Sequence, residues 1–132
     1  MKLKVIPIHT REASILADTI TPVSIYLKLR DRFVHSFLLE SSDYHGSDNS
    51  FSYICCDPIA YVKVGEEQTV IKLPHQPEST KVTRSVRQEV DDFAAAFRTP
   101  ASTNDGYIRS GLFGYLGYAA FAEKSKHAAL LP

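Results

Sequence analysis

Phe37-Leu38-Leu39-Glu40-Ser41-Ser42 is the stretch of this 132-residue chain that decides its fold. An apolar run bounded by polar residues predicts a β-strand, here over residues 33–41. Residues 42–49 are polar and rich in turn formers, and residues 51–56 form a second apolar run. We expect these two runs to pair as antiparallel strands across the loop, with Asp57-Pro58 ending the second strand.

The segment before this hairpin predicts a short strand, a loop and a helix. Residues 2–8 alternate and contain β-branched side chains, whereas residues 9–20 have no clear periodicity. Thr21 is a good N-cap, and Pro22 is favoured at the first helical position. We therefore expect a helix from Pro22 to about Asp31.

Beyond the hairpin, the sequence predicts two more strands that extend a β-meander. Residues 59–64 and 68–73 are rich in apolar and β-branched residues, and Gly65-Glu66-Glu67 separates them as a turn. Residues 74–79 contain two prolines and are expected to form a loop.

A long helix is expected next, because apolar residues recur there at helical spacing. Ser79 or Thr80 could cap it, and Pro100 lies just beyond its end. The spacings are four, four, three and four, for Val82, Val86, Val90, Phe93 and Phe97.

The last part of the chain is rich in glycine and aromatic residues. Residues 111–118 are expected to form a strand or a turn in which glycines permit close packing of the backbone. A short helix through about Leu130 is expected to follow. No linker or repeat divides the chain, so we expect one α+β domain: an antiparallel β-sheet (meander) with helices packed on one side.

Composition excludes several classes of function. The 15 basic and 15 acidic residues give zero net charge, which disfavours nucleic acid or an anionic membrane as the main partner. No apolar stretch approaches a membrane span or the core of a signal peptide. Cys55 and Cys56 are adjacent and form no disulfide framework, so we expect a reducing, cytoplasmic location.

The residues that usually carry catalysis form no recognisable constellation. The cysteines have no neighbouring base to activate them, and Asp91-Asp92 falls on the polar face of the expected helix. The glycines after residue 110 match no phosphate-binding pattern. No metal-ligand spacing occurs among the histidines, which are His9, His35, His45, His75 and His127. We expect no catalytic residue and no metal ligand.

Glu40 is the most informative polar residue. A carboxylate at the end of an apolar strand needs a positive partner if it is buried. That partner could be the ammonium of a ligand or an arginine or lysine of the chain, and the residues alone favour the internal salt bridge. In a regular strand, Glu40 and Ser41 point to opposite faces, so they share a ligand only where the strand ends or bulges.

Four segments in order resemble the N-terminal region of anthranilate synthase component I, a chorismate-utilising enzyme. The resemblance spans most of the chain, although aminodeoxychorismate synthase component I shares parts of the pattern. The segments are TPVSIYLKLRD at 21–31, FLLESS at 37–42, SFSYICCDP at 50–58 and GLFGYLGY at 111–118.

The resemblance implies that residues 1–132 are an N-terminal regulatory region within a larger chorismate-utilising fold. The family enzyme converts chorismate to anthranilate and pyruvate with Mg²⁺ and with ammonia from a glutamine amidotransferase subunit. Its catalytic and Mg²⁺-binding residues lie in a C-terminal region that this sequence lacks. We therefore expect a fragment that is inactive alone and holds no cofactor, in agreement with its apolar last residues.

The resemblance also implies a feedback site for L-tryptophan. Glu40 would meet the ligand ammonium, Ser41 would hydrogen-bond its polar end, and apolar side chains would pack on the indole. The residues carried over are Leu39, Glu40, Ser41, Phe51 and Ser52.

Two other interpretations remain open at the level of sequence. The chain could be a self-contained, non-catalytic amino-acid-binding module, or a structural domain in which Glu40 only pairs with an internal base. Open strand edges also make self-association plausible.

Overall fold

The computed structural model describes residues 4–40, 51–99 and 111–117. Within these ranges the chain combines two helices with small sheets, which confirms the α+β class in its general form. In chain order, the elements are β1 (Ile6–Pro7), α1 (Pro22–Leu29), β2 (Phe37–Glu40), β3 (Ser52–Cys55), β4 (Tyr61–Val64), β5 (Gln68–Lys72), β6 (Ser79–Val82), α2 (Val86–Ala95) and β7 (Phe97–Arg98).

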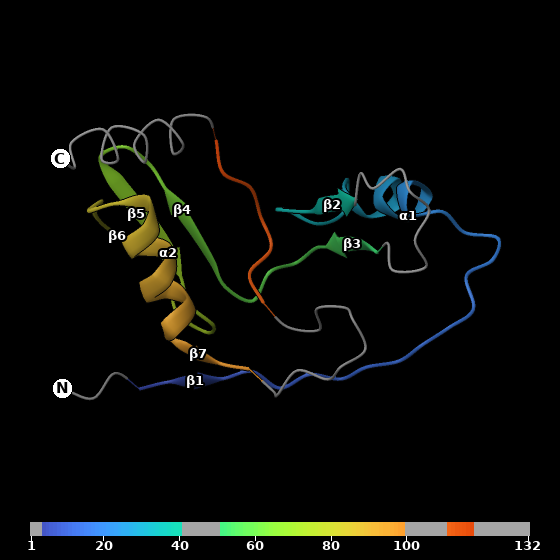
Figure 1. Ribbon diagram of the computed structural model, residues 1–132, viewed down its shortest axis with the longest axis horizontal. Helices are drawn as coiled ribbons and strands as arrows, with labels where there is room; N and C mark the ends of the chain where they lie inside the picture. Colours follow the sequence, from blue (N-terminus) through green and yellow to red (C-terminus); the bar gives the residue numbers. More distant parts are fainter. Residues whose placement is uncertain (1–3, 41–50, 100–110, 118–132) are drawn as a thin grey trace, which may run out of the picture.

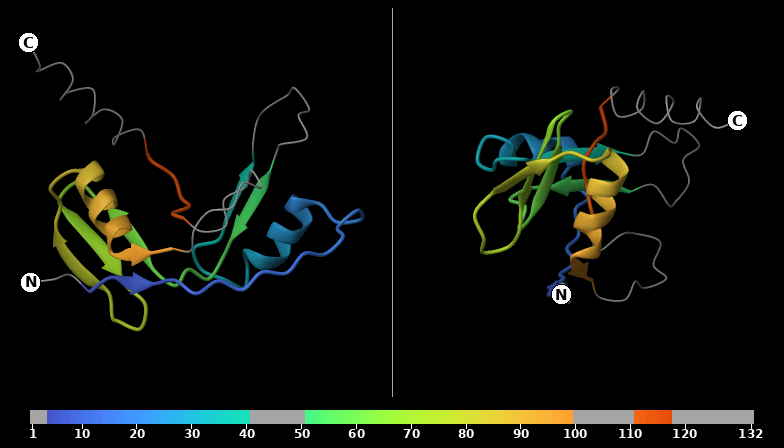
Figure 2. Two further views of the ribbon diagram at one scale, coloured as in Figure 1. Left: turned by 60° about the horizontal axis from the view of Figure 1, so that its bottom comes forward. Right: turned by 90° about the vertical axis from the view of Figure 1, so that its left-hand side faces the viewer.

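The elements form two arms that open away from each other (Figures 1 and 2). One arm contains β4, β5, β6 and α2, and the other contains β2, β3 and α1. Residues 8–20 run along the outside from the first arm to the second, so that α1 lies on the side of β2 and β3 away from the first arm.

The helix α1 confirms the prediction made from its capping residues. Ser24 donates its backbone N–H to Thr21 Oγ1 at 3.1 Å, and Thr21 donates its own N–H to Ser24 Oγ at 3.2 Å. This reciprocal capping satisfies two N–H groups that a helix start leaves unpaired. Pro22 occupies the first turn, where it removes no intrahelical bond.

The β2–β3 pair is antiparallel, as predicted, but β2 is shorter than expected. The register places Phe37 opposite Cys55 and Glu40 opposite Ser52. The strand begins only at Phe37 because His35 has φ 58°, a left-handed conformation that interrupts an extended chain. The expected loop at residues 42–49 lies outside the described residues.

The expectation of one continuous meander is wrong: β2–β3 and β4–β5–β6 are separate antiparallel sheets. The chain leaves β3 through Asp57, whose φ of 51° is left-handed, and Pro58 then offers no N–H for pairing. The turn between β4 and β5 forms as predicted, with Gly65 donating its N–H to Gln68 O at 3.0 Å. A Cβ on Gly65 would lie 2.8 Å from that oxygen, so this turn requires glycine.

The predicted helix start at Ser79 or Thr80 is also wrong. Those residues belong to β6, which pairs with β5 and places Val82 opposite Gln68. Thr83 continues this contact, because its Oγ1 lies 2.8 Å from Thr69 Oγ1. These cross-strand bonds hold a β-branched run as a strand, although its apolar spacing also fits a helix.

The helix α2 begins after Ser85, whose hydroxyl accepts the N–H of Gln88 at 3.2 Å. It ends before Phe97, which was also expected to be helical. Phe97 instead belongs to β7, which pairs in parallel with β1 and places Phe97 opposite Ile6. The rings of Phe93 and Phe97 still contact each other, with centroids 5.2 Å apart.

Three further expectations concern the ends of the chain. Of the strand expected over 2–8, the described residues contain Ile6–Pro7, and residues 2 and 3 lie outside them. Residues 112–117 form no strand, and a Cβ on Gly114 or Gly117 would meet no atom within 4 Å, so the close packing predicted for these glycines is wrong within the described ranges. The helix expected through Leu130 lies outside the described residues.

The hydrophobic core is small. Phe93, 4% exposed, is the one hydrophobic side chain classed as buried in the part of the chain that the structure describes. Among the described residues, large apolar side chains such as Ile15, Leu16, Val34 and Val82 are 74–85% exposed. The two arms therefore leave apolar side chains uncovered.

Replacing Phe93 tests this small core. We expect Phe93→Ala to lower the free energy of unfolding by about 3 kcal/mol, the lower end for a buried phenylalanine, because the adjacent open groove lets the site relax. Urea denaturation followed by circular dichroism measures the change. Val82, which is 78% exposed, provides the control: Val82→Thr should change the value by less than about 0.5 kcal/mol. A larger loss at Val82 than at Phe93 would contradict the placement of both residues.

Candidate functional site

The candidate site lies at the end of the β2–β3 hairpin. The register places Glu40 directly opposite Ser52, so the two side chains project from the same face of the ribbon. One step back, Leu39 pairs with Tyr53 on the other face. The apolar strand therefore delivers an acid and a hydroxyl together at its last pair.

Glu40 is exposed, and its carboxylate forms no ion pair with the described residues. The described residues therefore supply no internal base for it, and the salt bridge that the residues alone favour stays a prediction. An exposed carboxylate is accessible to a positively charged ligand.

The predicted site residues divide between the two faces of the ribbon. Glu40 and Ser52 share one face, whereas Leu39 lies on the other. Phe51, half-buried, directly precedes β3, and Ser41 lies outside the described residues. A single ligand reaches both sets only by lying around the end or a free edge of this two-stranded ribbon, where the two faces meet.

Tyr53 is a member of this site that the sequence did not single out. Its ring packs against Phe113, with centroids 5.4 Å apart, and it lies opposite Leu39. The sequence does indicate that Tyr53 belongs to the site, because side chains alternate along a strand and Tyr53 therefore lies on the same face as Phe51.

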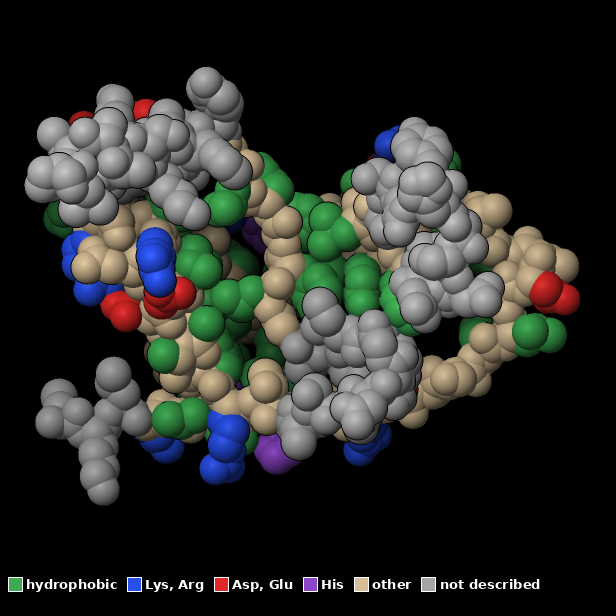
Figure 3. Space-filling view, in the orientation of Figure 1, with side chains coloured by type: hydrophobic (Ala, Val, Ile, Leu, Met, Phe, Trp, Pro, Cys, Tyr) green, Lys and Arg blue, Asp and Glu red, His purple; other side chains and the backbone are tan. Residues whose placement is uncertain are grey.

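A broad groove lies between the two arms. Its volume is about 900 Å³, and it is open to solvent along one side, where apolar side chains are visible on both walls (Figure 3). Aromatic side chains from both arms and from residues 111–117 line it, namely Phe37, Tyr61, Phe93, Phe113 and Tyr115. The face of β2–β3 that carries Phe37 and Leu39 therefore points toward this groove.

A charge cluster on the other arm has a structural role. The Glu89 side chain is fully buried, and it contacts Lys81 Nζ at 2.5 Å and Arg84 Nε at 3.0 Å. Arg84 also donates its backbone N–H to Glu89 and pairs with Asp92. The hydrogen bonds from Lys81 and then Arg84 lower the pKa of Glu89 to about 2. These contacts join α2 to β6.

The remaining reactive side chains of the described residues form no recognisable site. Burial, followed by the neighbouring Cys56, raises the pKa of the Cys55 thiol, which disfavours a nucleophilic thiolate. His35 packs on Tyr61, with ring centroids 4.9 Å apart. Over residues 4–40, 51–99 and 111–117, no group of three histidine, cysteine or acidic side chains could hold a metal ion. None of the helices in these ranges is long and apolar enough to cross a membrane.

Comparison of the chain with protein-family models, with curated proteins and with solved structures gives no match.

The Glu89 cluster predicts how stability depends on pH. Because the folded pKa of Glu89 lies below its ordinary value of 4.5, this group stabilises the fold fully above pH 4.5 and loses its contribution as the pH falls toward about 2. Glu89→Gln should lower the free energy of unfolding at pH 7. It should also reduce the change of that free energy between pH 4.5 and about pH 2. Urea denaturation at a series of pH values measures both effects.

Asp91 gives a matched control on the same helix, since its pair with Arg87 is 69% and 90% exposed. Asp91→Asn should leave the pH dependence intact, because exposed pairs contribute little. Equal behaviour of the two variants would show that Glu89 is not the group that titrates.

Proposed function

We propose that this chain is the N-terminal regulatory region of an anthranilate synthase component I, and that the end of its β2–β3 hairpin binds an amino-acid effector, L-tryptophan. The order of the four sequence segments supports the family. The hairpin geometry supports the site, because Glu40 and Ser52 lie side by side at the strand end.

The unpaired carboxylate of Glu40 carries the proposal. It is exposed, and none of the described residues neutralises it. The α-ammonium of an amino acid is a suitable partner, since a charge-assisted hydrogen bond is shorter and stronger than a neutral one. Ser52 presents a hydroxyl that can accept from the same ammonium or donate to the ligand carboxylate.

The apolar part of the ligand would use the opposite face of the ribbon. Leu39 and Phe51 are half-buried beside the strand end, and they offer surface to an indole ring. Ser41, next in the chain, would reach the polar end of the ligand. The groove beyond them is broad and open, so a further region of a longer polypeptide would complete the pocket.

The regulatory mechanism would be linkage between two sites. Tryptophan would bind more tightly to a low-activity arrangement of the full enzyme and shift the population toward it. The chemistry itself, with Mg²⁺ and the glutamine amidotransferase subunit, would belong to the C-terminal region. The chain alone would then bind the effector without converting chorismate.

Calorimetric titration with L-tryptophan tests the site. Glu40→Gln should weaken binding by roughly 10-fold or more, because a hydrogen bond to a charged group contributes about 1.5–3 kcal/mol. Indole-3-propionate, which lacks the ammonium, should bind the unaltered chain and the variant equally. The loss must therefore depend on the ligand ammonium as well as on Glu40.

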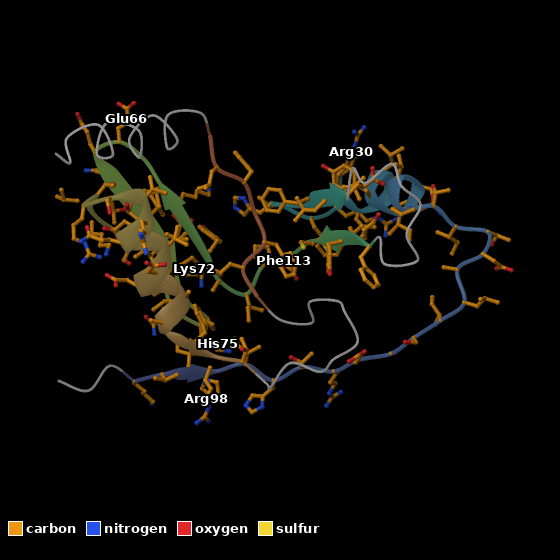
Figure 4. All side chains as sticks on the ribbon, in the orientation of Figure 1. Arg30, Glu66, Lys72, His75, Arg98 and Phe113 are labelled. Atoms are coloured by element: carbon orange, nitrogen blue, oxygen red, sulfur yellow. The ribbon has the colours of Figure 1, made fainter. Side chains whose placement is uncertain are left out.

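Glu66 provides the matched control, since it is an exposed glutamate in the turn at the far end of the other arm (Figure 4). Glu66→Gln should not change the affinity. A Glu40→Gln variant that keeps the affinity for tryptophan would rule out the proposed role.

Two further results would distinguish the alternatives. Binding of L-phenylalanine equal to that of L-tryptophan would favour a general amino-acid-binding module. If the chain binds neither amino acid, the same titration is repeated on a longer polypeptide that contains this sequence. Binding there would show that a further region completes the pocket. No binding there would show that the family assignment is wrong.

A further inference from the structure

Residues 111–117 contact the β2–β3 hairpin through two aromatic pairs. The ring of Phe113 packs on that of Tyr53, with centroids 5.4 Å apart and the two planes inclined at 37°. The ring of Tyr115 meets Phe37 edge-on, with centroids 6.1 Å apart. Both separations fall in the range in which aromatic rings attract each other. The aromatic side chains of the glycine-rich segment (orange-red in Figure 1) therefore pack on the hairpin.

The two aromatic pairs lie at different distances from the end of the hairpin. Tyr53 is directly opposite Leu39, in the pair next to the strand end. Phe37 lies two residues before Leu39, opposite Cys55, and so farther from that end. Phe113 therefore contacts the ring that is nearer the candidate site.

Tyr53 and Leu39 are neighbours across the ribbon. Side chains directly opposite each other in antiparallel strands have Cβ atoms about 4.5–5.5 Å apart, so these two share one apolar surface. Both side chains are half-buried. Phe51 precedes Tyr53 by two residues and lies on the same face. Tyr53 therefore forms the inner side of the surface proposed for the indole ring.

We infer that Phe113 is a positioning residue for the effector site: it holds the Tyr53 ring beside Leu39, where the tyrosine helps to receive the aromatic ring of the effector. This role, which rests on the proposed function, brings a segment distant in sequence into the site. Phe113 acts through Tyr53 and touches no ligand itself. A tyrosine side chain turns about two single bonds, and packing against a second ring restricts that motion.

A role of Phe113 in packing alone would have a different consequence. Loss of the ring would then lower the free energy of unfolding, but its effect on ligand affinity would not depend on Tyr53. A positioning residue has no effect on affinity once the side chain that it positions is removed. A double-mutant cycle distinguishes these two cases.

Calorimetric titration with L-tryptophan supplies the cycle. It compares the unaltered protein, Phe113→Leu, Tyr53→Leu and the double variant, in this chain or in the longer polypeptide if only that one binds. Phe113→Leu should raise the dissociation constant by roughly 3-fold or more, as expected for the loss of one aromatic pair. In the Tyr53→Leu background the same substitution should have no further effect. Phe113→Tyr keeps the ring and should keep the affinity.

Incorporation of 3-fluorotyrosine gives a second readout, which a loss of stability alone does not change. The fluorine resonance of Tyr53 is identified by its absence from Tyr53→Phe. It should shift in Phe113→Leu without ligand, because a neighbouring ring has been removed. In the unaltered protein it should also shift when L-tryptophan binds. A Tyr53 resonance that bound L-tryptophan leaves unchanged would overturn the positioning role.

Tyr115 provides the matched control in the same segment, because its partner Phe37 lies farther from the strand end. Tyr115→Leu should leave the affinity for L-tryptophan unchanged. Equal losses of affinity on changing Phe113 and Tyr115 would show that the segment acts only as a whole, which contradicts the specific role of Phe113.

The titrations separate failure of this role from failure of the proposed function. If the unaltered protein binds L-tryptophan and Phe113→Leu binds it equally well, the positioning role is wrong and the proposed function stands. The same holds if the effects of Phe113→Leu and Tyr53→Leu simply add in the double variant. If neither this chain nor a longer polypeptide that contains it binds L-tryptophan, the proposed function is wrong and the positioning role is wrong with it.

Discussion

The left-handed backbone of Asp57, followed by Pro58, is the constraint on which the rest of the structure depends. It stops β3 from continuing into β4, so the strands form two sheets instead of one. Aspartate tolerates this conformation better than most residues, and proline cannot supply the N–H that a continuous ladder would need. The division produces two arms, an apolar groove between them and several strand edges that remain unpaired within the described chain.

Each arm is held by local interactions because neither has a large core. In the first arm, Glu89 and Phe93 lie one helical turn apart on the same side of α2, and both are buried. Glu89 forms ion pairs with Lys81 and Arg84, and Phe93 fills the small core. In the second arm, the Thr21 capping box fixes the start of α1 against the hairpin. Ion pairs and hydrogen bonds thus supply much of the stability that burial of apolar side chains supplies in a larger domain.

The sequence predicted the elements whose determinants are local. Thr21 and Pro22 specify α1, and the apolar runs around residues 37–40 and 52–55 specify the hairpin. The prediction from sequence failed at β6, because the four-residue spacing between Val82 and Val86 fits a helix as well as a strand. The strand forms because it pairs with β5, and the nearby contact between the hydroxyls of Thr69 and Thr83 also joins residues 14 positions apart, so there is no local signal. The start of α2 does have a local signal, because Ser85 and Gln88 have the spacing of a capping box.

The site was predictable in its composition but not in its geometry. Glu40 stood out because a charge ended an apolar strand, whereas the register that places Ser52 beside it depends on the length of the hairpin. The same register connects the site with the groove. Ser52 is adjacent to Tyr53, and Tyr53 packs on Phe113 in the glycine-rich segment, which lines the groove.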